Sequence, residues 1–189
     1  MNRRVAGLAT IVAVALIVVV AAAVYFWGPR NRALQNASQS PVIGKAQVGH
    51  PAPNFEVATT AGLFTLSAAR KPVFLEVFAT WCPHCQRETV VMNRLYRRYG
   101  SAVNFVGVSG SDTGMDGTSP ASENDVLNWV RRFHAAYPVA YDPLMAVANL
   151  YLQGGFPTYA IIGRDKRVAY LNSGELSYND LAAALQRVL

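Results

Sequence analysis

The longest apolar stretch of the chain covers residues 5–27 and contains no charged residue. A helix over these 23 residues would rise roughly 35 Å, enough to cross a bilayer core of about 30 Å. An aromatic triplet at residues 25–27 ends the stretch, as at a membrane interface. We therefore expect residues 1–29 to be a single transmembrane anchor. A cleaved signal peptide is the alternative, because the three alanines at 21–23 would suit a cleavage site.

A polar segment separates this stretch from the rest of the chain. Residues 30–47 are rich in Asn, Gln, Ser, Pro and Gly, a composition typical of a tether. Residues 48–189 have the usual size of one domain with a single core. The expected parts are therefore an anchor at 1–29, a linker at 30–47 and one domain at 48–189. We expect the domain to lie outside the cytoplasm, in the periplasm or on the outer face of the cell membrane.

Within the domain, short apolar runs alternate with segments of helical periodicity. The apolar runs predict strands at residues 73–78, 103–108, 158–162 and 167–171. Apolar positions at helical spacing predict helices at residues 88–99, 122–133, 145–152 and 178–189. Ser122 and Asp125 resemble a capping box at the start of the second helix. This alternation predicts an α/β fold, and the final strand pair, joined by a short turn, makes its central sheet mixed.

The charge of the chain argues against a nucleic-acid-binding protein. The formal net charge is +6, but four of the seventeen basic residues flank the apolar stretch. From Ala33 onward there are thirteen basic and eleven acidic residues, which gives this part of the chain a net charge of +2. A nearly neutral domain gives no electrostatic reason to bind DNA or RNA.

The chain has two cysteines, Cys82 and Cys85, which directly follow the strand predicted at 73–78. A disulfide across so short a loop restricts the unfolded chain little, so it would stabilise the fold only weakly. A structural zinc site needs four ligands, and the chain has one Cys-x-x-Cys pair and three scattered histidines. A copper chaperone remains the alternative, with His134 or Met145 as a soft third ligand. We favour a redox pair, with a redox sensor whose output is binding as a third possibility.

The position of the pair supports thiol–disulfide exchange. The amino end of a helix offers unpaired N–H groups and a positive dipole, which stabilise a thiolate. We expect Cys82, the exposed member, to attack a substrate disulfide. Cys85, one helical turn further, would then resolve the mixed disulfide and form the Cys82–Cys85 disulfide. This chemistry requires no cofactor and no metal.

Four segments together resemble the membrane-anchored thioredoxin-like family of TlpA and ResA, namely residues 48–55, 62–66, 73–85 and 155–158. The resemblance implies a thioredoxin fold with an added amino-terminal β-hairpin, and an insert at residues 110–122. It also implies that Pro157 is a cis-proline beside the disulfide, where a residue without an N–H would shape the substrate groove. The implied activity is that of a thiol–disulfide oxidoreductase.

The expected partners follow from this activity. The substrates would be cysteine-containing exported proteins, with apocytochrome c in the reductive case, and cytochrome c maturation or disulfide-bond formation as the process. A membrane electron-transfer or quinone-linked protein would restore the redox state of the pair. The amino-terminal helix would hold the enzyme at the membrane.

Two acidic residues lie near the cysteines in sequence. Glu76 lies six positions before Cys82 in an otherwise apolar strand. Burial there would raise its pKa and suit it to accept the proton of Cys85, whereas a solvated edge position is the alternative. Glu88 matches an acid found near the disulfide in some family members, although periodicity alone is equally consistent with an ordinary first-turn helix residue.

Three further residues are expected to tune access and potential: Trp81, Pro83 and His84. The Pro-His pair resembles that of periplasmic oxidants of the DsbA type, whereas reductive relatives more often carry other pairs. Stabilising a thiolate by about 1.4 kcal/mol raises a two-electron potential by roughly 30 mV, and known couples span about 150 mV. One residue therefore cannot set the direction of exchange, and the sequence leaves that direction open.

Overall fold

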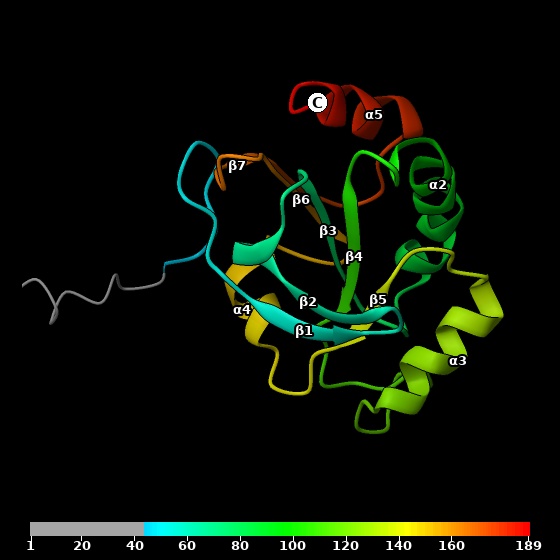
Figure 1. Ribbon diagram of the computed structural model, residues 1–189. Coiled ribbons are helices and arrows are strands. Elements are labelled where there is room, and N and C mark those ends of the chain that lie inside the picture. Colours follow the sequence, from blue (N-terminus) through cyan, green and yellow to red (C-terminus); the bar gives the residue numbers. More distant parts are fainter. Residues whose placement is uncertain (1–43) are drawn as a thin grey trace, which may run out of the picture. The chain divides into compact units, whose positions relative to one another are not determined.

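The computed structural model describes residues 44–189 (Figure 1). The expected anchor and residues 30–43 of the expected linker lie outside these described residues. From residue 44 onward, none of the helices combines the length and the apolar character that crossing a bilayer requires. Ala46, placed in the linker by sequence, is buried, and its N–H donates to the Leu150 carbonyl at 2.7 Å. The packing of the domain therefore includes the end of the expected linker.

Over residues 44–189, seven strands form one mixed sheet in the order β2-β1-β5-β4-β3-β6-β7. The strands are β1 (Glu56–Thr59), β2 (Gly62–Thr65), β3 (Val73–Phe78), β4 (Asn104–Ser109), β5 (Val139–Tyr141), β6 (Thr158–Ile162) and β7 (Val168–Ser173). Strands β3, β4 and β5 run parallel, whereas β6 and β7 add an antiparallel pair at one side. The β1–β2 hairpin joins the other side through β5. This topology confirms the predicted mixed α/β sheet and the added amino-terminal hairpin.

The helices of the same region cover both faces of the sheet (Figure 1). They are α2 (Pro83–Tyr99), α3 (Glu123–Phe133), α4 (Ala146–Tyr151) and α5 (Tyr178–Gln186), with a 3₁₀ turn, η1, at Leu66–Ala68. Helices α2, α3 and α5 pack on one face in a core that includes Trp129 and Leu181. Helix α4 packs on the other face around Tyr151. Two apolar layers therefore enclose the sheet.

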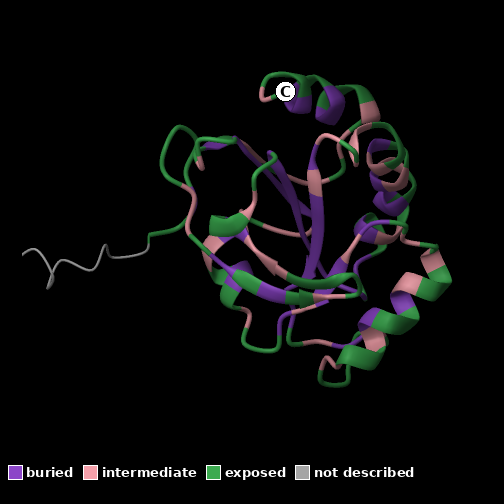
Figure 2. Cartoon of the chain, in the orientation of Figure 1, coloured by how far each residue is buried: buried purple, intermediate pink, exposed green. Residues whose placement is uncertain are grey.

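Strand β3 lies inside the sheet, between β4 and β6, and every one of its six residues is buried (Figure 2). Alternate side chains of a strand point to opposite faces. Phe74 and Phe78 belong to the core under α2, whereas Leu75 and Val77 belong to the core under α4. Glu76 lies between the two phenylalanines in this alternation, so its carboxyl is on the α2 face.

Most predicted elements are present, although α5 ends at Gln186 rather than at residue 189. Helix α2 extends the periodic segment at residues 88–99 back to Pro83 and so begins at the cysteine pair, because a proline fits the first turn, where no N–H partner is required. Strand β5 was not predicted, since its three residues are too few to show a period. The predicted capping box of α3 is confirmed, because the Ser122 hydroxyl accepts from the Asp125 N–H at 3.3 Å and the Asp125 carboxylate accepts from the Ser122 N–H at 2.9 Å.

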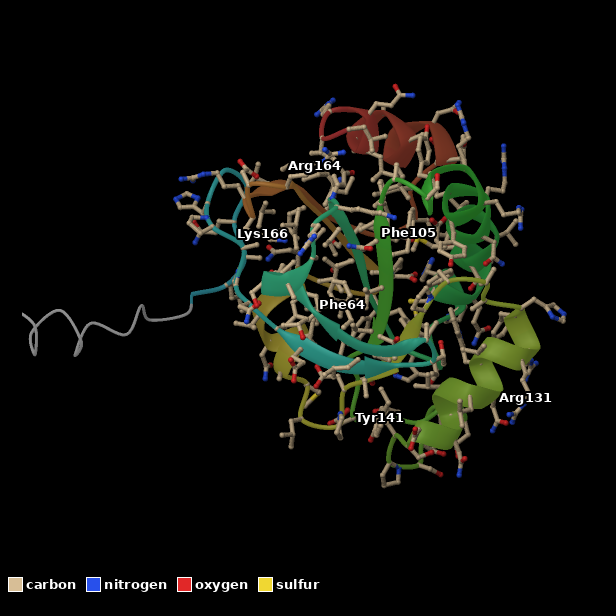
Figure 3. The ribbon with its side chains drawn as sticks, viewed as in Figure 1. Phe64, Phe105, Arg131, Tyr141, Arg164 and Lys166 are labelled. Atoms are coloured by element: carbon tan, nitrogen blue, oxygen red, sulfur yellow. The ribbon has the colours of Figure 1, made fainter. Side chains whose placement is uncertain are left out.

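The insert expected at residues 110–122 is a loop between β4 and α3. Thr113 and Pro120 pair across it in an isolated antiparallel bridge. The hydroxyl of Tyr141, labelled in Figure 3, donates to the Ala121 carbonyl at 2.7 Å. The loop is thereby attached to the end of β5, at the edge of the sheet where β3 and β4 also end.

Candidate active site

The two cysteines lie where β3 passes into α2. Cys82 is the N-cap residue of α2 and has extended backbone geometry, with φ −73° and ψ 117°. Its N–H donates to the Ala79 carbonyl at 3.1 Å, which closes the turn after the strand. Pro83 occupies the first helical position, and Cys85 lies within the first turn. The amino end of α2 therefore begins at the first thiol, as the sequence predicts.

Both thiols are free in the structure, and the disulfide between them stays a prediction. Cys82 is only 3% exposed and Cys85 is fully buried. Cys82 is therefore the more accessible of the two cysteines, as expected. The expectation that its side chain is exposed is wrong, because it is almost fully buried. Its cover is the loop before β6, where the Phe156 carbonyl accepts from the Cys82 thiol at 3.6 Å.

This covering loop contains the expected cis-proline. The Phe156–Pro157 peptide bond is cis, which confirms the conformation implied by the family resemblance. The buried Thr158 hydroxyl donates to the Gly155 carbonyl at 2.8 Å and so ties the loop to the start of β6. Pro157 therefore follows directly after the carbonyl that contacts the Cys82 sulfur.

Trp81 forms an apolar surface beside the cysteines. Its side chain is partly exposed, and its indole N–H donates to the Ser111 hydroxyl at 2.9 Å. The Trp81 ring also meets the Phe156 ring edge-on, with centroids 6.1 Å apart. The ring is thus fixed between the insert and the cis-proline loop.

Glu76 lies behind the pair and is fully buried. Burial raises its pKa from 4.5 to about 8; the hydrogen bond from Tyr137 opposes this shift, and the charge of Glu88 adds to it. The Tyr137 hydroxyl donates to Oε2 at 2.8 Å. The alternative of a solvated edge position is wrong, because β3 lies between β4 and β6.

The buried thiol of Cys85 responds to the same surroundings. Burial raises the pKa of Cys85 far above its ordinary value, and the negative charge of Glu76 raises it further. Near neutral pH, Cys85 is therefore a thiol, and Glu76 is poised to exchange a proton. A group that can accept that proton is what the resolving step needs.

Glu88 is also directed toward the core. The helical periodicity of the sequence alone could not predict this burial. It is 6% exposed, and Oε2 accepts from the buried Tyr159 hydroxyl at 2.9 Å. Burial raises the pKa of Glu88, while the Tyr159 hydroxyl and the Leu176 backbone N–H oppose the shift. Two carboxyl groups, each held by a tyrosine, therefore lie on the α2 face of the sheet.

His84 and Arg87 project from the exposed side of α2 toward Glu175. The Nδ1 atom of His84 lies 2.6 Å from Glu175 Oε1, and the Arg87 Nε–H donates to the same oxygen at 2.9 Å. The pKa of Glu175 is lowered, chiefly by Arg87 and then by His84. The guanidinium and the imidazole at this end of α2 therefore share one carboxylate.

Three residues of this site were not found by sequence reasoning: Tyr137, Tyr159 and Glu175. The two tyrosines lie in apolar segments, where an aromatic residue predicts packing in the core rather than a role in the site. Glu175 lies in the connection between β7 and α5, 90 positions from Cys85 in the sequence. Only the folded arrangement brings it next to the Pro-His pair.

The copper alternative receives no support from residues 44–189. Among these residues no three His, Cys, Asp or Glu side chains come close enough together to hold a metal ion. His134 is the C-cap residue of α3, and Met145 packs against the core under α4, whereas both cysteines belong to the core under α2.

Comparison with known proteins finds thiol–disulfide oxidoreductases. Thiol-disulfide oxidoreductase ResA of Bacillus cereus is 31% identical over 147 residues, which cover 76% of this chain and 80% of ResA. ResA of Geobacillus thermodenitrificans is 28% identical over 144 residues, which cover 75% of this chain and 78% of that protein.

Solved structures show the same fold at lower identity. A crystal structure from Chlorobium tepidum, assigned as a thiol:disulfide interchange protein DsbE, superposes with a TM-score of 0.66 at 23% identity over 76% of this chain and 99% of that chain. StoA from Bacillus subtilis gives a TM-score of 0.59 at 17% identity over 72% of this chain and 98% of that chain.

The fold and the cysteine pair define a thioredoxin-like thiol–disulfide oxidoreductase, similar to TlpA and ResA. The chain belongs to the Redoxin family, which matches it over residues 47–185.

Proposed function

We propose that this oxidoreductase is tethered to the membrane, acts outside the cytoplasm, and reduces disulfides in exported proteins, apocytochrome c among them. The observation that carries the chemistry is the pair of thiols at the start of α2 above the fully buried carboxyl of Glu76. The uncharged stretch at residues 5–27 supports the tether. An apocytochrome c carries a Cys-x-x-Cys-His segment for haem attachment, so a disulfide there must be reduced first.

The proposed reaction has two exchange steps. Cys82 first loses its thiol proton to solvent. Its sulfur then attacks one sulfur of the substrate disulfide, which forms a mixed disulfide and releases the other substrate sulfur as a thiolate. Cys85 then gives its proton to the Glu76 carboxylate, and its sulfur attacks Cys82 and releases the second substrate thiolate. Both substrate thiolates take protons from solvent, and Glu76 returns its proton to solvent. The substrate gains two electrons, and the enzyme becomes the Cys82–Cys85 disulfide.

The charges around the pair support the reducing direction. A strong oxidant stabilises its reduced form, typically through positive groups next to the attacking thiolate. Here the Arg87 guanidinium and the His84 imidazole both contact the Glu175 carboxylate. Cys85 is fully buried, which disfavours its thiolate, and ionisation of Glu76 would disfavour that thiolate further. The reduced form therefore gains little stabilisation, as in a reductant.

A reductant needs a source of electrons for the next turnover. We propose a membrane electron-transfer protein with its own dithiol, linked to the quinone pool, as the donor. It would attack the Cys82–Cys85 disulfide in the reverse of the two steps above. Pro157 follows the carbonyl that contacts the Cys82 sulfur, and the Trp81 ring packs against Phe156, so both substrate and donor would bind against this pair of residues.

The direction is tested by a glutathione redox titration of the full chain in detergent, with the two thiols quantified by alkylation. We expect a potential near that of thioredoxin, about −270 mV. The same preparation should reduce a disulfide peptide that contains Cys-x-x-Cys-His with multiple turnovers. A potential near that of DsbA, about −120 mV, would contradict the reducing role.

The location is tested separately with a topology reporter. Alkaline phosphatase fused after Leu189 folds only where disulfides form, so the fusion should be active in cells. A fusion that is inactive as phosphatase, while a cytoplasmic reporter at the same position is active, would overturn the extracytoplasmic placement.

A further inference from the structure

The residue opposite Glu76 on the neighbouring strand is a glycine. In the parallel β3–β4 pairing, Glu76 is in register with Gly107. A Cβ at position 107 would lie 2.9 Å from Cε2 of Tyr137 and 3.5 Å from Oε2 of Glu76. The first distance is shorter than real Cβ contacts. The absence of a side chain at Gly107 is therefore what allows the Tyr137 ring to reach the carboxyl.

Tyr137 lies two residues before β5 and is itself buried, with 2% of its surface exposed. The backbone around it is fixed, because the Gly107 N–H donates to the Pro138 carbonyl at 2.9 Å and Gly107 is in register with Val139. The hydroxyl therefore arrives at Glu76 from a rigid segment of the sheet, and it donates at 2.8 Å to one oxygen, Oε2.

Four titratable groups face Glu76 from the elements packed against it. Tyr137 approaches from the segment before β5, Cys85 and Glu88 from α2, and Tyr159 from β6. The Tyr159 hydroxyl donates its hydrogen bond to Glu88 rather than to Glu76. Among the described residues, Oε1 of Glu76 is buried and has no hydrogen-bond partner. Of the two carboxyl oxygens, Oε2 therefore accepts a hydrogen bond and Oε1 accepts none from the described part of the chain.

We propose that Tyr137 is a positioning residue for the proton transfer between Cys85 and Glu76. Its hydroxyl fixes Oε2, which leaves Oε1 open to the proton, and Gly107 provides the space for this contact. The proposal rests on the role of Glu76 in the proposed function, and it deepens that role by naming what orients the carboxyl.

This arrangement has a measurable consequence for the pH dependence of resolution. A hydroxyl that donates to a carboxylate favours the ionised form. Removing the hydroxyl should raise the pKa of Glu76 above its value of about 8. Hydrogen bonds to charged groups are strong enough to move such a midpoint by about one pH unit. The carboxylate fraction near neutral pH then falls about tenfold, and the resolving step slows with it.

The test is the rate at which Cys85 resolves a mixed disulfide on Cys82, measured by stopped flow from pH 5.5 to 9.5 with the full chain. For the wild type we expect a rise with a midpoint near 8. For Tyr137→Phe we expect the midpoint about one pH unit higher and the rate at pH 7 about tenfold lower. Gly107→Ala, which keeps the hydroxyl but moves the ring, should also shift the midpoint upward.

Tyr151→Phe is the matched control. Tyr151 is fully buried, and its hydroxyl donates to the Pro53 carbonyl at 2.5 Å, but it belongs to the core on the other face of the sheet. This variant loses a buried tyrosine hydroxyl without touching Glu76, so its midpoint should equal that of the wild type. An equal shift in Tyr151→Phe and Tyr137→Phe would assign the effect to general destabilisation and overturn the proposal.

Glu76→Gln separates this inference from the proposed function. If Glu76→Gln abolishes the titration while Tyr137→Phe keeps the wild-type midpoint, Glu76 is the proton acceptor and the role of Tyr137 is wrong. If Glu76→Gln leaves the profile unchanged, the proposed role of Glu76 itself fails, and the role of Tyr137 fails with it.

Discussion

Burial of Glu76 should make the stability of the domain depend on pH, and Glu76→Gln should remove that dependence. The pKa of Glu76 is about 8 in the folded protein, against an ordinary value of 4.5. Between these values the folded state keeps a proton that the unfolded state has released. The stabilisation is therefore fully present below pH 4.5, and it is lost as the pH rises toward 8.

The magnitude follows from the width of this window. Each pH unit inside it costs the folded state about 1.4 kcal/mol. From pH 5 to pH 7 the wild type should therefore lose roughly 2 to 3 kcal/mol of unfolding free energy relative to Glu76→Gln. The glutamine is close in shape and cannot ionise, so any packing cost that it introduces is the same at every pH.

The assay is urea denaturation of both proteins in reductant at half-unit steps from pH 4.5 to 8, followed by tryptophan fluorescence. The informative quantity is the difference between the two unfolding free energies as a function of pH, because all shared carboxyl groups cancel in it. A difference that stays constant across this range would refute the claim that Glu76 is buried with a raised pKa.

Three further predictions concern other parts of the site and fold. Glu175→Gln removes the carboxylate that matches His84 and Arg87, so the reduction potential should rise by up to about 30 mV in a glutathione titration; an unchanged potential would show that this exposed cluster is fully screened. Ser122→Ala removes the cap of α3 and should lower the unfolding free energy by about 1 kcal/mol in urea, whereas no change would mean that the capping box contributes nothing. Gly110→Ala would place a Cβ 2.5 Å from Cβ of Ala148 beside the active site, so it should lower the unfolding free energy by about 2 kcal/mol; wild-type stability would show that α4 can shift.

The sequence was sufficient for the fold because its strongest signals are local and periodic. The apolar run of β3 is fully buried, as a central strand should be, and Ser122 and Asp125 form the expected capping box. Strand β5 could not be found in this way, because its three residues pair with β1 and β4 only after the chain has folded.

The chemistry of the site was predictable in part. The two cysteines and Glu76 stand out because a thiol pair is rare and an acid in an apolar run is anomalous. Tyr137 and Glu175 act through contacts with residues 61 and 91 positions away, respectively, so no local pattern reveals them. The burial of Cys82 was missed for the same reason, since its cover comes from the distant cis-proline loop.

The most direct test of the central claim is a trapping experiment with matched serine variants of the full chain. Cys85→Ser retains the attacking sulfur and loses the resolving one, so it should accumulate mixed disulfides with exported proteins through Cys82. Cys82→Ser, isolated from the same cells and analysed by non-reducing gels and mass spectrometry, should accumulate few or none, because Cys85 is fully buried. Equal trapping by both variants, or by neither, would contradict the assignment of Cys82 as nucleophile and Cys85 as resolving thiol.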